Sequence, residues 1–174
     1  MPQAVRETIG STVKMELVIR PATRDDVPLV LTFIKNLAEY ERLSHEVTAT
    51  EQDLADTLFG PRPGAEVLLG FASGEPAAFA LFFSNYSTFL GKPGIYLEDL
   101  FVRPAWRGKG FGKAMLSAVA RTAVERGCGR LEWSCLDWNE PSIGFYKSLG
   151  AQAMDEWTVY RLTGNTLKGF AGAE

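Results

Sequence analysis

The hydrophobic and polar positions of this chain follow a helical period in three long stretches. Residues 27–38 place apolar side chains three and four positions apart, as on one face of a helix. Residues 50–59 predict a second helix, because Thr50 is followed three positions later by Asp53, the spacing of a capping box. Residues 111–126 carry the clearest apolar helical face of the sequence.

Between these helices lie short runs rich in β-branched and aromatic residues, bounded by turn residues. The two runs on either side of residues 73–76 predict a β-hairpin. A short helix is predicted at 139–150, with Pro141 in its first turn. The predicted strands are residues 15–20, 65–72, 77–86, 95–102, 129–138 and 157–162. This order of elements predicts an α/β fold with a mixed sheet and helices packed on it.

The length of 174 residues, with 46% hydrophobic and 22% charged residues, fits one globular domain. Residues 1–14 are polar without a period and are predicted to form a flexible N-terminal arm. We expect a single domain over residues 15–165, followed by a C-terminal tail at 166–174. Because no apolar run is long enough for a signal peptide core or a membrane span, we expect a cytoplasmic protein without a membrane partner.

The net charge of −3 argues against a nucleic-acid partner, because neutralising phosphates requires an excess of Lys and Arg. Cys128 and Cys135 are seven positions apart and lack the spacing of zinc ligands. We therefore expect no metal, and we interpret both cysteines as small buried residues of a reduced protein.

A glycine-rich loop precedes the helix at 111–126. It matches neither the Walker loop, since Ala114 follows Gly112 and Lys113, nor the Rossmann pattern of three glycines. Its glycines allow backbone amides to converge on an anion at a helix N-terminus, which favours a pyrophosphate flanked by Arg107 and Lys109. A flexible connection with solvated cations is the alternative when the loop is considered alone.

Five stretches occur together in an order that resembles the GCN5-related N-acetyltransferase (GNAT) superfamily and, within it, the diamine acetyltransferase branch. This branch comprises the spermidine/spermine and thialysine N-acetyltransferases. The five stretches are IRPAT at 19–23, LAEYE at 37–41, YLEDLFV at 96–102, the Arg107-x-x-Gly-x-Gly loop and WNEPSIGFYKSLGA at 138–151. The resemblance covers about residues 16–162 and implies the GNAT fold. That fold has a mixed, mostly antiparallel sheet of about six to seven strands, in which two strands splay apart to bind acetyl-CoA.

The resemblance implies three groups of residues that bind acetyl-CoA. One strand supplies backbone amides to pantetheine, the glycine loop holds the pyrophosphate, and the distal helix adds polar contacts. These residues are Leu100, Phe101 and Val102; Arg107, Gly108, Lys109, Gly110, Phe111, Gly112 and Lys113; and Asn139, Ser142, Tyr146 and Lys147.

The resemblance also implies catalytic roles. Acetyl transfer needs a neutral amine, whereas an alkylammonium has a pKa of about 10, so a base is required at neutral pH. Glu98 matches the family's candidate base, acting directly or through water, and Tyr146 matches its general acid. Strand alternation places Tyr96, Glu98 and Leu100 on one face and Asp99 on the other, so we expect Asp99 to have a structural role or to make a secondary contact.

Tyr40, Glu41, Glu98 and Trp157 match positions that bind the amine in the polyamine enzymes. An aromatic ring beside a carboxylate makes a cation site. The sequence thus predicts direct acetyl transfer from acetyl-CoA, within a ternary complex, to a primary amine of a polyamine, a diamine or a lysine-like amino acid. A protein or peptide N-acetyltransferase and a CoA-binding regulatory domain without turnover are the alternatives. The resemblance further suggests a homodimer.

Overall fold

The computed structural model describes residues 5–9 and 15–172, and the chain forms two compact units. The first unit extends to Ser134 and contains the sheet with its covering helices. The second unit begins at Cys135 and contains two helices. Each unit is described below by itself.

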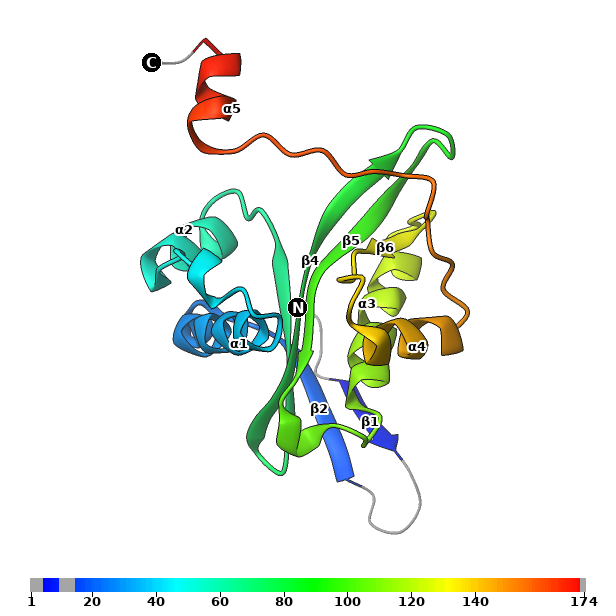
Figure 1. The fold of residues 1–174 in the computed structure, drawn as a ribbon. Coiled ribbons are helices and arrows are strands. Elements are labelled where there is room, and N and C mark those ends of the chain that lie inside the picture. Colours follow the sequence, from blue (N-terminus) through cyan, green and yellow to red (C-terminus); the bar gives the residue numbers. More distant parts are fainter. Residues whose placement is uncertain (1–4, 10–14, 173–174) are drawn as a thin grey trace. The chain divides into compact units, whose positions relative to one another are not determined.

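The first unit is built on one six-stranded sheet in which the strands lie in the order of the sequence (Figure 1). The strands are β1 Val5–Ile9, β2 Met15–Pro21, β3 Glu66–Ala72, β4 Glu75–Ser87, β5 Lys92–Val102 and β6 Leu131–Trp133. The first four pairings are antiparallel, and β5 pairs with β6 in parallel. This confirms the predicted α/β fold with a mixed, mostly antiparallel sheet, at the lower end of the predicted strand number.

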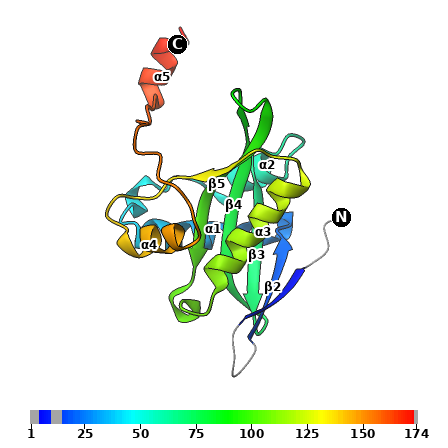
Figure 2. The same ribbon diagram turned by 90° about the vertical axis from the view of Figure 1, so that its right-hand side faces the viewer.

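Helices cover both faces of this sheet. In the first unit, α1 Val27–Tyr40 and α2 Glu51–Phe59 lie on one face, and α3 Phe111–Glu125 lies on the other (Figures 1 and 2). Short 3₁₀ turns occupy Arg24–Asp26, Ser44–Glu46 and Pro104–Trp106. As predicted, Thr50 caps α2: its Oγ1 accepts a hydrogen bond from the Asp53 amide at 3.2 Å, and its own amide donates to Asp53.

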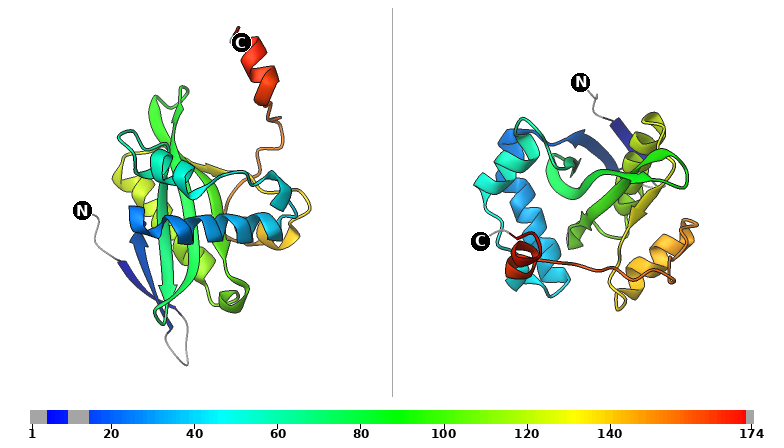
Figure 3. Two further views of the ribbon diagram at one scale, coloured as in Figure 1. Left: turned by 90° about the vertical axis from the view of Figure 1, so that its left-hand side faces the viewer. Right: turned by 90° about the horizontal axis from the view of Figure 1, so that it is seen from above.

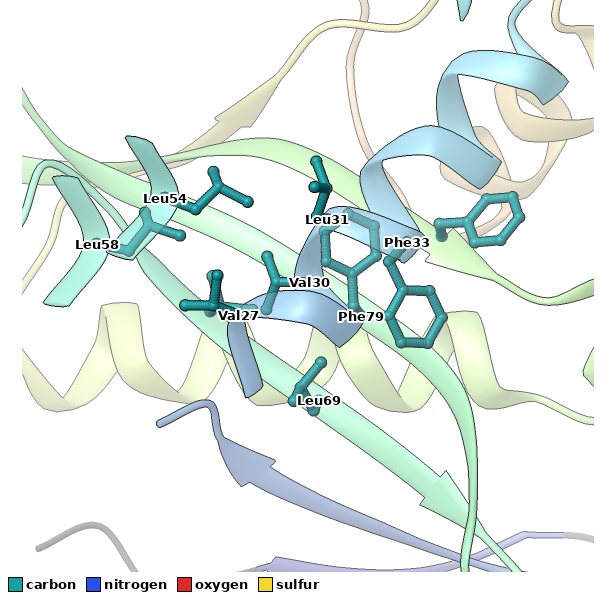
Figure 4. Packing of buried hydrophobic residues seen from close by; sticks show 10 residues of the cluster. Val27, Val30, Leu31, Phe33, Leu54, Leu58, Leu69 and Phe79 are labelled. Carbon is teal, nitrogen blue, oxygen red and sulfur yellow. The ribbon is translucent and has the colours of Figure 1, made fainter. Parts of the chain in front are cut away.

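The main hydrophobic core lies between the sheet and the first two helices, and α1 runs across the sheet in the left-hand view of Figure 3. Phe33 of α1 stacks on Phe79 of β4 with ring centroids 5.1 Å apart, and Phe101 of β5 meets Phe33 edge-on at 6.4 Å. Figure 4 shows their neighbours, which are Val27, Val30, Leu31, Leu54, Leu58 and Leu69. Burying each large apolar side chain contributes about 1.5–3 kcal/mol, so this core fixes α1 against β4 and β5.

The opposite face of the sheet is covered by α3, with Met115 and Val119 fully buried. Gly70 of β3 provides the room, because a Cβ atom at this position would lie 3.0 Å from the Met115 sulfur and 3.2 Å from Leu17 Cδ1. This close approach positions α3, and with it the glycine loop before its first turn.

A β-bulge interrupts the pairing of β4 with β5. Leu81 pairs with Asp99 and Phe82 pairs with Leu97, so Glu98 is an extra residue on β5. Residues opposite one another share a face, and Phe79 and Phe83 flank Leu81 at two-residue spacing on β4. Their partners are Phe101, Asp99 and Tyr96, which therefore all lie on the α1 face.

The predicted division of β5 into two faces was consequently wrong. Tyr96 lies on the same face as Asp99, and the stacking of Tyr96 on Phe83 at 5.3 Å confirms its side. Simple alternation fails because the extra residue shifts the strand by one position at Glu98.

Four further elements differ from the predicted pattern. The strand predicted at 129–138 is limited to β6, Leu131–Trp133. Val5–Ile9 form β1, paired with β2, inside the stretch expected to be an arm without regular structure. Residues 157–162 are not a strand, since the described part of the second unit contains only helices and offers no strand edge for them. The expected tail overlaps a helix, α5 Gly164–Phe170, which follows α4 Glu140–Ser148 in this unit.

Candidate active site

The C-terminal end of α1 holds Tyr40 and Glu41 in a tight chain reversal. The amide of Leu43 donates to the carbonyl of Ala38 at 2.7 Å, and the amide of Arg42 donates to that of Glu39 at 3.1 Å. This is the bonding pattern of a helix-ending motif whose left-handed position usually carries glycine. Here Arg42 occupies it with φ of 63°, so the end of α1 retains a strained residue beside the candidate substrate site.

Two carboxylates act on a third near this helix end. The pKa of Asp99 is raised to about 7, mainly by burial and in addition by the negative charges of Glu98 and Glu41. Burial also raises the pKa of Glu41. Asp99 thus combines a position on the α1 face of β5 with a pKa near neutrality, the property required of a general base.

Glu98 occupies a different environment from its neighbour. As the bulge residue it is exposed, whereas Asp99 is partly buried. The sequence predicted catalysis or substrate binding by Glu98, and a structural role or a secondary contact for Asp99. In the structure it is Asp99 whose pKa is raised to about 7, and the negative charge of Glu98 is one cause of that shift.

Arg107 extends toward α1. Its guanidinium carbon lies 4.6 Å from the centroid of the Tyr40 ring and 5.3 Å from that of Phe101, and its Nε donates to the carbonyl of Val102 at 2.9 Å. The predicted cation site on Tyr40 therefore holds a cation of the protein itself. This side-chain position differs from the expected one beside the pyrophosphate, although the Arg107 backbone remains at the start of the loop.

The C-terminal half of β5 carries the three predicted pantetheine contacts. The pairing with β6 spans Ile95 to Leu97 and ends where Leu97 meets Trp133. Beyond it, Leu100 and Phe101 pair with β4 on the other side of the strand. In the first unit the second edge of β5 is thus open from Glu98 onward, which is the strand arrangement that an added pantetheine chain requires.

The glycine loop has the conformation that an anion site needs. Gly108 and Gly110 have φ values of 71° and 80°, and Gly110 is the N-cap of α3. Among the described residues, the amide of Ala114 is the first after Arg107 to reach a main-chain acceptor, the Gly110 carbonyl at 3.0 Å. The preceding amides, including those of Phe111, Gly112 and Lys113 at the helix N-terminus, are suited to bind a pyrophosphate.

Two aromatic rings anchor this loop. Trp106, which ends the preceding 3₁₀ turn, stacks on Phe111 with centroids 5.9 Å apart, and Phe111 is buried. Phe111 therefore supports the loop from the core, while Lys109 is exposed.

The second unit gathers the remaining predicted cofactor residues on α4. Asn139 is buried and caps this helix, its Oδ1 accepting a hydrogen bond from the Ser142 amide at 3.4 Å. Tyr146 packs against Phe145 with ring centroids 5.2 Å apart, and Lys147 follows in the last turn. Trp157, the predicted substrate wall, is 70% exposed in this unit.

Sequence reasoning missed two features of the site, the raised pKa of Asp99 and the position of the Arg107 side chain. The adjacent acids at 98 and 99 inside an apolar strand were a usable signal for the first, since a carboxylate in such a strand can become buried. No local signal indicated that Arg107 would stack on Tyr40, because the two residues are brought together only by the packing of α1 on β5.

Two other kinds of site are not found in the described part of the chain. No cluster of three or more His, Cys, Asp or Glu side chains there is arranged to hold a metal ion. None of its helices has the length and apolar character that crossing a membrane requires.

Comparison with known proteins identifies the family. Residues 34–151, from α1 to the end of the α4 region, match the model of the acetyltransferase (GNAT) family. The chain belongs to this family, and it is an acetyl-CoA-dependent N-acetyltransferase, as the resemblance implied.

Relatives match almost the whole chain. The L-ornithine N5-acetyltransferase NATA1 of Arabidopsis thaliana is 37% identical, with 96% of this chain and 93% of the relative covered. The thialysine N-epsilon-acetyltransferase of Bos taurus is 37% identical, with 90% and 98% covered. Among solved structures, an integron cassette protein from the V. cholerae mobile metagenome superposes with a TM-score of 0.75 at 30% identity, covering 90% of this chain and 98% of its own.

Proposed function

We propose that this protein transfers the acetyl group of acetyl-CoA to a primary amine of a small cationic substrate, by direct attack in a ternary complex. The observation that carries the proposal is Asp99, a partly buried carboxylate with a pKa raised to about 7, beside Glu41 and near the open edge of β5. Relatives that act on ornithine and thialysine support a diamino acid, with di- and polyamines as the wider class.

The proposed proton path begins at the carboxylates of β5. Asp99 accepts the proton of the substrate ammonium, directly or through water, because its pKa lies closer to neutrality than that of an ordinary carboxyl group. We assign to Asp99 the role that the resemblance gives to Glu98, while Glu98 and Glu41 keep the pKa of Asp99 high. The freed amine nitrogen forms its bond to the acetyl carbon, and the carbon–sulfur bond breaks.

The resemblance supports the remaining roles. Tyr146 gives its hydroxyl proton to the departing CoA thiolate, and the second proton that the nitrogen loses as the amide forms restores the Tyr146 hydroxyl. Asp99 releases the first proton to solvent, which completes the proton balance. The amides of Leu100, Phe101 and Val102 hold pantetheine along the open edge of β5, and the loop from Arg107 to Lys113 holds the pyrophosphate. Asn139, Ser142 and Lys147 supply further polar contacts to the donor.

The end of α1 is proposed to receive the cationic part of the substrate. Glu41 provides a carboxylate, the carbonyl end of α1 adds partial negative charge, and Tyr40 provides an aromatic surface. The proposal retains Glu98 and Trp157 as further substrate contacts on the strength of the resemblance.

The proposal is tested by following thiol release from acetyl-CoA with ornithine, lysine, thialysine, putrescine, spermidine and a lysine-containing peptide. We expect turnover with small amines. Asp99→Asn should lower kcat about 10²–10⁴-fold, the usual range for a lost general base, while leaving acetyl-CoA affinity unchanged. The control Asp25→Asn changes an exposed acid in the 3₁₀ turn before α1 and should leave kcat unchanged.

The comparison of adjacent variants decides the assignment. If Glu98→Gln abolishes turnover and Asp99→Asn does not, the roles of the two carboxylates are reversed. Acetyl-CoA binding without thiol release for every amine would contradict the enzymatic proposal and favour the regulatory domain.

We also propose a cytoplasmic location, a homodimer and a transferase domain that spans residues 15–165. The resemblance supports these three points, and the family match at 34–151 lies inside the proposed domain. The oligomeric state is measured directly by light scattering of the purified chain.

A further inference from the structure

The position of the Arg107 guanidinium is not explained by acetyl-CoA binding. It lies over the Tyr40 ring at 4.6 Å and close to the Phe101 ring at 5.3 Å, on the side of the sheet that carries α1. Tyr40 is adjacent to Glu41, and Phe101 shares its face of β5 with Asp99. The positively charged Arg107 guanidinium thus lies in the region proposed to bind the substrate amine.

Arg107 does not neutralise these carboxylates. The pKa of Asp99 stays raised to about 7, and burial and other carboxylates, rather than an ion pair, determine it. The guanidinium donates from Nε to Val102, and no hydrogen bond from its two terminal nitrogens to a described residue is found. These nitrogens form the planar fork that matches a carboxylate.

The end of α1 therefore presents charges of both signs. Glu41 and Asp99 favour an ammonium or amine group, whereas the Arg107 fork favours a carboxylate. A diamine would place its second ammonium near a fixed guanidinium, and like charges repel. A diamino acid would instead offer an amine to the acids and its α-carboxylate to the arginine.

We propose that Arg107 binds the α-carboxylate of the substrate and thereby makes this site selective for diamino acids over diamines of the same chain length. This inference rests on the proposed function, because it names the class of small amine that the same site accepts. The Arg107 backbone can still contribute to the pyrophosphate loop, since the side chain and the main chain face different ligands.

The chemistry offers two matched substrate pairs. Putrescine is ornithine without its carboxylate, and cadaverine is lysine without its carboxylate. Binding of each compound to the protein saturated with CoA is measured by calorimetry, which requires no turnover. We expect the wild-type protein to bind ornithine more tightly than putrescine, and lysine more tightly than cadaverine.

The variant Arg107→Gln removes the charged fork. The substitution should lower the affinity for ornithine about 10- to 100-fold, the effect expected for a lost charge-assisted pair. The affinity for putrescine should stay unchanged or increase. Because both ligands are measured on the same CoA-saturated variant, damage to the pyrophosphate loop cancels in their ratio. Circular dichroism verifies that the variant is folded.

Arg103→Gln is the matched control. Arg103 also stacks on a ring, with its guanidinium carbon 4.9 Å from the Phe33 centroid, and it donates to a backbone carbonyl, that of Pro76 at 3.2 Å. The ratio of the affinities for ornithine and putrescine in Arg103→Gln should equal that of the wild type. The same ratio in Arg107→Gln as in the wild type, or tighter wild-type binding of putrescine, would overturn the proposal. Absence of turnover with intact ornithine selectivity would contradict the proposed function alone.

Discussion

The negative charge of Glu41, at the end of α1, raises the pKa of Asp99 on β5, although 57 residues separate them in the sequence. The bulge at Glu98 makes this relationship possible, because it places Asp99 on the face of the sheet that α1 covers. A helix end and a strand irregularity together create the candidate base.

Replacing Glu41 should change the pH dependence of catalysis. Glu41→Gln removes one of the charges that raise the pKa of Asp99, so the acidic limb of kcat/KM should move to lower pH. The measurement is a pH profile of kcat/KM from pH 5 to 9. Glu39 is exposed and lies two residues before Glu41, so the control Glu39→Gln should leave the acidic limb of kcat/KM at the wild-type pH. An unshifted limb in Glu41→Gln would remove Asp99 from the proposed proton path.

Replacing Asp99 should stabilise the folded protein at high pH, whereas replacing a carboxylate that forms an ion pair destabilises it. Its folded-state pKa of about 7 lies above the ordinary value of 3.8, so the folded protein binds more protons between these values and loses stability as pH rises through this window. Asp99→Asn should therefore gain stability relative to the wild type at pH 8, by up to roughly 4 kcal/mol, and less at pH 5. Urea unfolding at both pH values measures the difference in unfolding free energy between variant and wild type. An equal difference at pH 5 and pH 8 would contradict the raised pKa of Asp99.

Asp26 should show the reverse behaviour. Arg20 binds both of its carboxylate oxygens, at 2.7 and 2.8 Å, and lowers the pKa of Asp26 to about 2. This stabilisation is present above pH 4 and is lost as pH falls toward 2. Asp26→Asn should lose about 1–3 kcal/mol at pH 6, and the deficit should shrink at pH 2.5. Unfolding free energies across this range check the slope, and a deficit independent of pH would contradict it.

Tyr146 should affect chemistry without affecting donor binding. Tyr146→Phe removes the hydroxyl proposed to protonate the leaving thiolate, so kcat should fall about 10²–10⁴-fold at unchanged affinity for acetyl-CoA. The neighbouring Phe145→Leu tests whether loss of ring packing at 5.2 Å has the same effect. An equal loss of kcat in both variants would indicate that Tyr146 only packs against its neighbours and donates no proton.

Gly110 should affect both the backbone and acetyl-CoA. Its φ of 80° is unfavourable for other residues, so Gly110→Ala should cost about 1–2 kcal/mol of stability. It should also raise the KM for acetyl-CoA, because it distorts the amides at the start of α3. Gly91 has a φ of 60° in the turn between β4 and β5, and Gly91→Ala should cost similar stability at an unchanged KM. A similar KM in both variants would place the pyrophosphate elsewhere.

Local sequence patterns predicted much of the fold correctly. The apolar positions of α1, α2 and α3 recur every three or four residues, so a short window of sequence is enough to detect them. Thr50 with Asp53 marks the start of a helix in the same local way. The hairpin of β3 and β4 and the glycines before α3 were identified for the same reason. Residues 157–162 show the limit of this approach, because a β-branched and aromatic run becomes a strand only where a neighbouring strand pairs with it.

The candidate site depended more on tertiary structure. The sequence by itself determined the family, the glycine loop, Tyr146 on a short helix and the acids at 98 and 99, since these are matters of residue type and spacing. Tertiary structure decided which acid has a pKa near 7 and where Arg107 points. A bulge is a property of two paired strands, and a pKa depends on burial and charge through space, so neither is encoded in the neighbouring residues alone.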